Sequence, residues 1–182
     1  AGNAPDFVLC SSGYYPPYVE AGSFQDVSDF YDLPEADADD FDQNVVDLLY
    51  YDDLCVGIPM QMVSHYFYWD KDLYEAAGLD PESPPETFEE IVENAQILTD
   101  KSKNQYGFCL PTDNNVTAQY TLYAYGGGYV NEDETQAMFN TDANVQAFET
   151  MKTLYECSPK DTDDNTYISG QLAQFINGPW II

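Results

Sequence analysis

The feature that most restricts the fold is a long run over residues 60–69, which ends in Ser64-His65-Tyr66-Phe67-Tyr68-Trp69. Its last six residues are too aromatic and too continuous for a strand that has one face in water. Strands that are apolar on both faces are typical of positions covered on both sides. We therefore predict that this extended run crosses the interior of the protein.

Helical patterns alternate with short apolar runs along the rest of the chain. The clearest helix begins at Thr87, because Thr87 and Glu90 form a capping box and apolar residues repeat on one face as far as residue 99. Other helices are expected over residues 18–21, 40–51, 72–77, 117–125, 142–155 and 168–173. Strands are expected over residues 6–10, 56–59, 106–110 and 174–177. In the helix over 142–155 we expect the inward side chains to be Val145, Phe148, Met151 and Tyr155. The alternation predicts an α/β protein with layered helices.

The charge balance is strongly acidic, with 33 Asp and Glu against 5 basic residues and a formal net charge of −28. Such a chain repels nucleic acid and anionic membranes, so no nucleic-acid partner is expected. The acidic run over residues 35–40 lacks the glycine and the distal Glu of an EF-hand loop, and we predict no metal site there. We also expect no cofactor. No apolar stretch approaches the roughly 20 residues of a membrane span.

Four cysteines lie far apart in the sequence, at Cys10, Cys55, Cys109 and Cys157. No C-x-x-C pair of the zinc or redox type is present, which argues against a metal cluster. Three full disulfide pairings are open, as are free thiols. Of these we favour buried thiols.

Catalytic patterns were sought among the carboxylates, the cysteines and the single histidine. Glu89, Glu90 and Glu93 fall on the exposed face of the helix that begins at Thr87, where carboxylates serve solubility and the helix dipole. His65 has no accompanying hydrolase or metalloprotease motif, so we interpret it as structural, and nothing in the sequence orients it toward Cys10. We expect no catalytic residues. The 16 tyrosines and 2 tryptophans instead suit a carbohydrate site, since sugars need aromatic faces to stack on and polar groups to hydrogen-bond.

Several sequence blocks, in order along the chain, resemble the family 1 extracellular solute-binding proteins of ABC importers. The blocks are Ala4-Pro5-Asp6-Phe7-Val8, Tyr18-Val19-Glu20-Ala21-Gly22, Gly57-Ile58-Pro59, Tyr68-Trp69-Asp70-Lys71-Asp72-Leu73, Ala77-Gly78-Leu79, Pro85-Glu86-Thr87-Phe88, Tyr106-Gly107-Phe108, Tyr125-Gly126-Gly127 and Asn177-Gly178-Pro179-Trp180.

The resemblance implies a type II periplasmic-binding-protein-like fold, in which two α/β lobes are joined by a hinge. On this basis residues 1–60 are expected to form part of the first lobe, without its N-terminal strand and helix. Residues 61–182 are expected to form the hinge crossing and most of the second lobe. The chain is thus expected to be incomplete at both ends.

The same resemblance implies a monomeric extracellular or periplasmic protein that captures a mono- or oligosaccharide between its lobes and delivers it to a membrane permease. It also implies lipid anchoring at the cell surface through a cysteine upstream of residue 1. No reaction is implied. A secreted carbohydrate-active enzyme or a surface adhesin that reuses the fold is the alternative.

The resemblance also assigns the candidate binding residues. Trp180 corresponds to an aromatic residue that stacks on sugar in the second lobe. The remaining candidates lie in loops, in the crossing segment and at a helix start, and are Ser11, Ser12, Tyr14, Gln61, Ser64, Asn115 and Tyr120. Cys10, Gly13 and Val63 depart from the residues of maltodextrin binders, which argues against maltodextrin as the ligand.

Overall fold

The computed structural model describes residues 5–11, 13–111, 116–161 and 164–181. The chain forms two compact units, Ala1–Met62 and Val63–Ile182.

The first unit is built of short elements around a small core. It contains α1 (Pro16–Glu20), η1 (Ser28–Asp32), η2 (Pro34–Ala36), η3 (Ala38–Asp40), α2 (Gln43–Asp47), β1 (Tyr50–Tyr51) and β2 (Leu54–Cys55). The two strands form an antiparallel hairpin. Its buried apolar side chains include Tyr15, Val46 and Cys55, and the hydroxyl of Tyr15 donates to the carbonyl of Leu48 at 2.6 Å.

Three predictions for this unit need correction. The strands expected over 6–10 and 56–59 are wrong, because neither segment belongs to a strand of the described chain, and Phe7 is 93% exposed. A strand exists only where a neighbouring backbone pairs with its amide and carbonyl groups, which an apolar run cannot reveal. The helix expected over 40–51 is reduced to the five residues of α2. The helix closed by Gly22 is confirmed as α1, and Gly22 has the positive φ of +64° that favours glycine.

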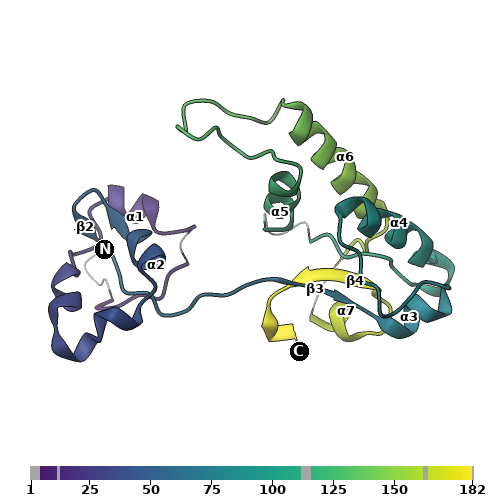
Figure 1. Ribbon diagram of the computed structural model, residues 1–182, viewed down its shortest axis with the longest axis horizontal. Helices are drawn as coiled ribbons and strands as arrows, with labels where there is room; N and C mark the ends of the chain where they lie inside the picture. The colour runs from purple at the N-terminus through teal and green to yellow at the C-terminus, as the bar shows by residue number, and fades with distance from the viewer. Residues whose placement is uncertain (1–4, 12, 112–115, 162–163, 182) are drawn as a thin grey trace. The chain divides into compact units, whose positions relative to one another are not determined.

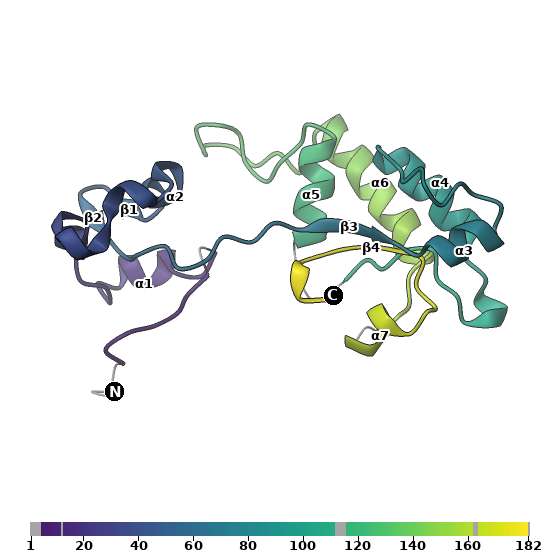
Figure 2. The same cartoon turned by 60° about the horizontal axis from the view of Figure 1, so that its bottom comes forward.

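The second unit is organised around an antiparallel pair of strands. The prediction that the run over residues 60–69 crosses the interior is wrong, because none of these residues is buried and only the last four form a strand. β3 (Tyr66–Trp69) pairs with β4 (Gln174–Asn177), with Tyr66 opposite Asn177 and Trp69 opposite Gln174. The strand predicted over 106–110 is not formed: Tyr106 and Cys109 make only isolated parallel bridges, to Leu172 and Phe175. Figures 1 and 2 show helices α4, α5 and α6 on one side of this layer and α7 on the other.

Helices α3, α4, α5 and α6 lie close to the ranges predicted from the sequence. The helices of this unit are α3 (Lys71–Ala76), α4 (Phe88–Leu98), α5 (Val116–Ala124), α6 (Asp142–Glu156) and α7 (Asp164–Ile168), with short 3-10 turns η4 (Lys101–Lys103) and η5 (Pro179–Ile181). Thr87 caps α4 by accepting from the amide of Glu90 at 3.2 Å. The carboxylate of Glu90 accepts in return from the amide of Glu86, one residue before the usual capping-box partner. The predicted α4 is therefore confirmed with its cap.

The inward face of α6 differs from the prediction. Met151 is buried, but Val145, Phe148 and Tyr155 are each more than 40% exposed. The buried face is instead formed by Asn144, Ala147, Met151 and Leu154. A polar Asn occupies this face because its side chain accepts from the amide of Gly128 at 3.0 Å and donates to two loop carbonyls at 2.7 Å. A repeat of apolar residues cannot predict that a polar amide side chain such as this one is buried.

The predicted helix over 168–173 is also wrong, because α7 ends where that helix was expected to begin. Gly170 has a φ of +70°, which terminates helical structure. The backbone beyond it is extended and exchanges hydrogen bonds with Tyr106. The strand predicted over 174–177 is confirmed as β4.

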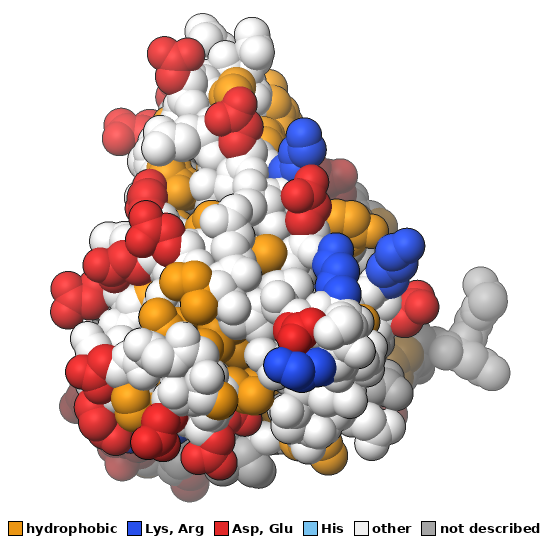
Figure 3. All heavy atoms as spheres, turned by 90° about the vertical axis from the view of Figure 1, so that its right-hand side faces the viewer, with side chains coloured by type: hydrophobic (Ala, Val, Ile, Leu, Met, Phe, Trp, Pro, Cys, Tyr) orange, Lys and Arg blue, Asp and Glu red, His pale blue; other side chains and the backbone are white. Residues whose placement is uncertain are grey.

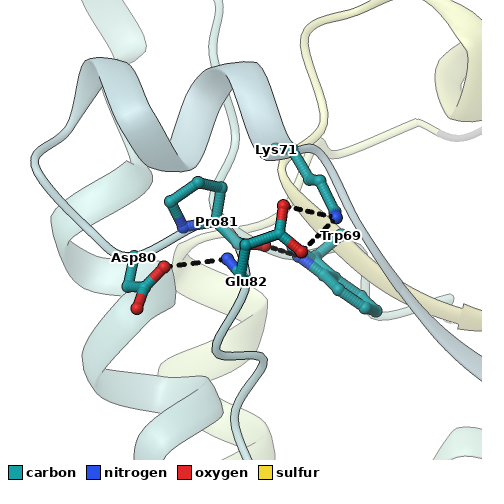
Figure 4. Close-up of polar contacts among 5 residues, drawn as sticks. All are labelled: Trp69, Lys71, Asp80, Pro81 and Glu82. Carbon is teal, nitrogen blue, oxygen red and sulfur yellow. Dashed lines mark hydrogen bonds and ion pairs between the residues drawn. The ribbon is translucent and has the colours of Figure 1, made fainter.

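The end of β3 is fixed to the loop after α3 by a set of polar contacts (Figure 4). The indole nitrogen of Trp69 donates to the carbonyl of Pro81 at 3.0 Å, and Lys71 pairs with Glu82 at 2.8 Å. The amide of Glu82 donates to Asp80 at 2.9 Å. These contacts hold the strand in place at the end opposite to the candidate site described below.

On the face shown in Figure 3, acidic side chains outnumber the lysines, and small apolar patches also reach the surface. The four cysteines are thiols, and three of them, Cys55, Cys109 and Cys157, are buried, as predicted. Cys10 is only partly buried. No helix within the described residues is long and apolar enough to cross a membrane.

Candidate functional site

Three aromatic side chains from distant parts of the sequence meet at one end of the β3–β4 pair. His65 directly precedes β3 and Trp180 lies in η5, just after β4. Because the strands are antiparallel, the start of one and the end of the other lie side by side. The rings of His65 and Trp180 are 5.5 Å apart, edge to face at 89°. The third member, Tyr120 of α5, places its hydroxyl 2.8 Å from Nδ1 of His65. We call His65, Tyr120 and Trp180 the aromatic cluster.

Trp180 keeps most of its ring available to solvent, with 62% of the residue exposed. The indole lies directly over the backbone of Gly178, where any side chain would collide with ring atoms. The turn beneath it is held by the Tyr68 hydroxyl, which donates to the Gly178 carbonyl at 3.2 Å, and by Asn177 Oδ1, which accepts from the Gly178 amide at 2.8 Å. The Asn-Gly-Pro-Trp block therefore builds a platform for an exposed indole.

Tyr120 is half-buried, and burial raises the pKa of its phenol above the usual value. The group therefore stays protonated at neutral pH, where it can both donate and accept a hydrogen bond. Together with Trp180 it offers the two elements that a sugar ring requires, an aromatic face and a directional polar group.

The other predicted residues are distributed over both units. Ser64 is exposed and adjoins His65. Ser11, Tyr14 and Gln61 are exposed on the first unit, where the amide of Tyr14 donates to the carbonyl of Ser11 at 2.9 Å. Ser12 and Asn115 lie outside the described residues. Of the eight candidates, the structure brings Tyr120 and Trp180 together, through a histidine that sequence reasoning assigned to a structural role.

All eight candidates lie in stretches of sequence without formal charge. Residues 7–19, 54–69, 114–131 and 165–182 contain no Asp, Glu or Lys, although the whole chain carries 38 such residues, 33 acidic and 5 basic. Buried charges and charged ligands need a partner of opposite charge to offset their desolvation. These segments provide aromatic faces, hydroxyls and amides, which suit an uncharged polar ligand.

The groups considered for catalysis have the following surroundings in the described part of the chain. Glu89, Glu90 and Glu93 are exposed on α4. Nδ1 of His65 faces the Tyr120 hydroxyl, and the Cys10 thiol of the other unit contacts the carbonyl of Ser11 at 3.6 Å. No group of three or more His, Cys, Asp and Glu residues arranged to hold a metal ion occurs in the part of the chain that the structure describes.

The fold is shared with solved structures of solute-binding proteins. One is the ABC transporter solute-binding protein from Thermotoga lettingae TMO, bound with α-D-tagatose, with a TM-score of 0.80 at 23% identity. The superposition covers 93% of this chain and 46% of that one. The architecture is therefore that of the type II periplasmic-binding-protein-like fold, as predicted.

The chain belongs to the bacterial extracellular solute-binding proteins, whose family model matches residues 1–182. This confirms the resemblance drawn from the sequence blocks. The maltodextrin-binding protein MdxE of Bacillus subtilis is 24% identical over 99% of this chain. The protein named "Probable amino-acid ABC transporter periplasmic-binding protein y4oP" from Sinorhizobium fredii is 29% identical over 68% of it. The chain spans 44% and 28% of the lengths of these two relatives.

Proposed function

We propose that the protein is the extracellular solute-binding component of an ABC importer and that it captures an uncharged mono- or oligosaccharide without altering it. The observation that carries this proposal is the aromatic cluster, with its exposed indole and neighbouring phenol on segments free of formal charge. An indole face binds the C–H face of a sugar, and the phenol binds a sugar hydroxyl.

The relatives support a solute-binding role but name different ligands, and the charge of the site distinguishes between these. The relatives named for maltodextrin and for an amino acid, and the structure bound with tagatose, span neutral and zwitterionic ligands. An amino acid presents a carboxylate and an ammonium group, which bind best to groups of opposite charge. Because the candidate segments carry no Asp, Glu or Lys, we assign an uncharged ligand.

Binding without catalysis is proposed for the same reason. Glycoside hydrolysis requires two carboxyl groups that flank the scissile bond. The four segments that contain the candidate residues include no Asp or Glu.

In this proposal the two units contribute to two lobes, divided near residue 60 and joined by the run that leads into β3. Ser11, Ser12, Tyr14 and Gln61 contact the ligand from the first lobe. Ser64, Asn115, Tyr120 and Trp180 contact it from the second. Ligand contacts to both lobes favour a closed form that a membrane permease recognises. The monomeric state and the lipid anchor remain predictions from the resemblance.

The test is a thermal-shift screen followed by calorimetry of the full protein against neutral sugars and polyols, with amino acids and glycerophosphodiesters as charged competitors. We expect a neutral sugar to bind, and Trp180→Ala to weaken its affinity at least about tenfold, because a stacked aromatic ring is a typical binding hot spot. Tyr123→Ala is the matched control, since Tyr123 is an exposed aromatic residue of α5 outside the cluster. Binding of amino acids alone, or equal affinities of wild type and Trp180→Ala, would contradict the proposal.

A further inference from the structure

His65 is the only histidine of the chain, and it contacts both aromatic residues of the proposed site. Its Nδ1 lies 2.8 Å from the Tyr120 hydroxyl, and its ring meets the Trp180 ring edge to face. These contacts span 55 positions of sequence to Tyr120 and join α5 to η5 through the residue before β3. His65 is therefore in contact with both residues of the cluster that are proposed to bind the ligand.

We propose that His65 is a positioning residue that sets the hydrogen-bonding polarity of Tyr120, so that affinity for a neutral sugar falls when His65 becomes protonated. This inference rests on the proposed function. When the imidazole is neutral, Nδ1 accepts the Tyr120 hydroxyl proton and Nε2 carries the ring hydrogen. The phenol oxygen then presents its lone pairs to the ligand and accepts from a sugar hydroxyl.

Protonation of His65 reverses this arrangement. An imidazolium ring can only donate, so Nδ1–H donates to the Tyr120 oxygen and occupies one of its lone pairs. The Tyr120 proton must then point elsewhere, and the phenol becomes a donor toward the ligand. A sugar hydroxyl that had donated to Tyr120 loses its partner or must reorient. Burial raises the pKa of Tyr120, so the phenol itself stays neutral throughout this pH range.

The sequence segments that contain His65 and its two aromatic partners carry no Asp, Glu or Lys. The His65 ring contacts Tyr120 from α5 and Trp180 from η5. Residues 54–69 and 114–131, which flank it on its own segment and on α5, carry no Asp, Glu or Lys. The imidazolium therefore acts directly on the phenol and on the indole.

The first experiment measures the affinity of the full protein for its best neutral sugar at pH 8 and pH 5.5. If His65 is protonated at the lower pH, we expect a decrease of about three- to tenfold, the range of one hydrogen bond. His65→Gln and Tyr120→Phe should each remove the pH dependence. Tyr123→Phe, outside the cluster, should retain it. A wild-type affinity that changes no more than that of His65→Gln overturns the proposal.

Two readouts do not need a ligand. In the ¹⁵N NMR spectrum of histidine-labelled protein at pH 8, the signals lost in His65→Gln should show Nδ1 without a proton and Nε2 with one. Because an imidazolium ring quenches a neighbouring indole, acidification should reduce tryptophan fluorescence in wild type more than in His65→Gln. A proton on Nδ1 at pH 8, or identical fluorescence titrations, overturns the coupling. If no sugar binds at either pH, the proposed function fails, whereas these two measurements still decide whether His65 controls the cluster.

Discussion

Gly178→Ala tests whether the platform beneath Trp180 is what creates the site. A Cβ atom at position 178 would lie 2.5 Å from Cε3 of Trp180 and closer still to two other ring atoms. Carbon atoms in contact are about 3.5 Å apart or more, so the indole must move by at least about 1 Å.

The energies of the two possible responses indicate whether the indole stays in place or moves. Keeping the ring in place would cost about 1–3 kcal/mol, as for other over-packed positions. Releasing it loses the edge-to-face contact with His65, about 0.5–1.5 kcal/mol, and the ring is already 62% exposed. We therefore expect Trp180 to leave its position, with little effect on stability and a loss of sugar affinity of about tenfold or more.

The assay combines calorimetry with near-ultraviolet circular dichroism, which reports the surroundings of the indole, and thermal denaturation. Gly57→Ala is the control, because a Cβ there meets no atom within 4 Å. Unchanged affinity and an unchanged aromatic spectrum in Gly178→Ala would refute the reasoning. So would a large drop in melting temperature with normal affinity, since that would place the strain in the fold.

Three further predictions concern stability. Asn144→Ala should lower the free energy of unfolding by about 2–4 kcal/mol in urea denaturation, because three hydrogen bonds to a loop are lost, two of them buried. Equal stabilities of this variant and Gln146→Ala would contradict this prediction. Hydrogen bonds to its neighbours lower the pKa of Asp100 to about 2, so its stabilising contribution is present above pH 3.8 and is lost as the pH falls through 2. Asp100→Asn should be less stable than wild type at pH 5 and equally stable below pH 2. Burial raises the pKa of Tyr31 to about 12, which favours the neutral phenol in the folded state. The free energy of unfolding should therefore fall from pH 10 to 12 in wild type, and fall less in Tyr31→Phe. An equal decrease in the two proteins would exclude that effect.

Local chemistry made several elements predictable. Helix α4 begins where Thr87 can cap it, and α3 ends at Gly78, which has a φ of +80°. Such signals depend on residues within one turn of each other, so they need no knowledge of the fold. The errors occurred where burial depends on distant partners. Phe7 and its apolar neighbours resemble a buried strand but are exposed, and α6 buries Asn144 in place of Val145.

The same distinction between local and distant partners decides which residues of the candidate site could be predicted from sequence. Trp180 and Tyr120 could be proposed from sequence blocks because each lies in a recognisable local pattern. The role of His65 could not, since its partners are 55 and 115 residues away, and a lone histidine among aromatic residues is typical of a structural position. Its neighbour Ser64, already a candidate in the crossing run, was the only local indication.

The sequence by itself determined the α/β class, the family, the capped helices and the uncharged, aromatic character of the segments that contain the candidate residues. Those properties follow from composition and short-range patterns, which the order of residues states directly. Only the tertiary structure decided which face of α6 is buried and which residues meet at the end of the β3–β4 pair. Strand pairing brings the residue before β3 beside the residues after β4, more than 100 positions later. That contact converts separate aromatic side chains into the proposed sugar-binding surface.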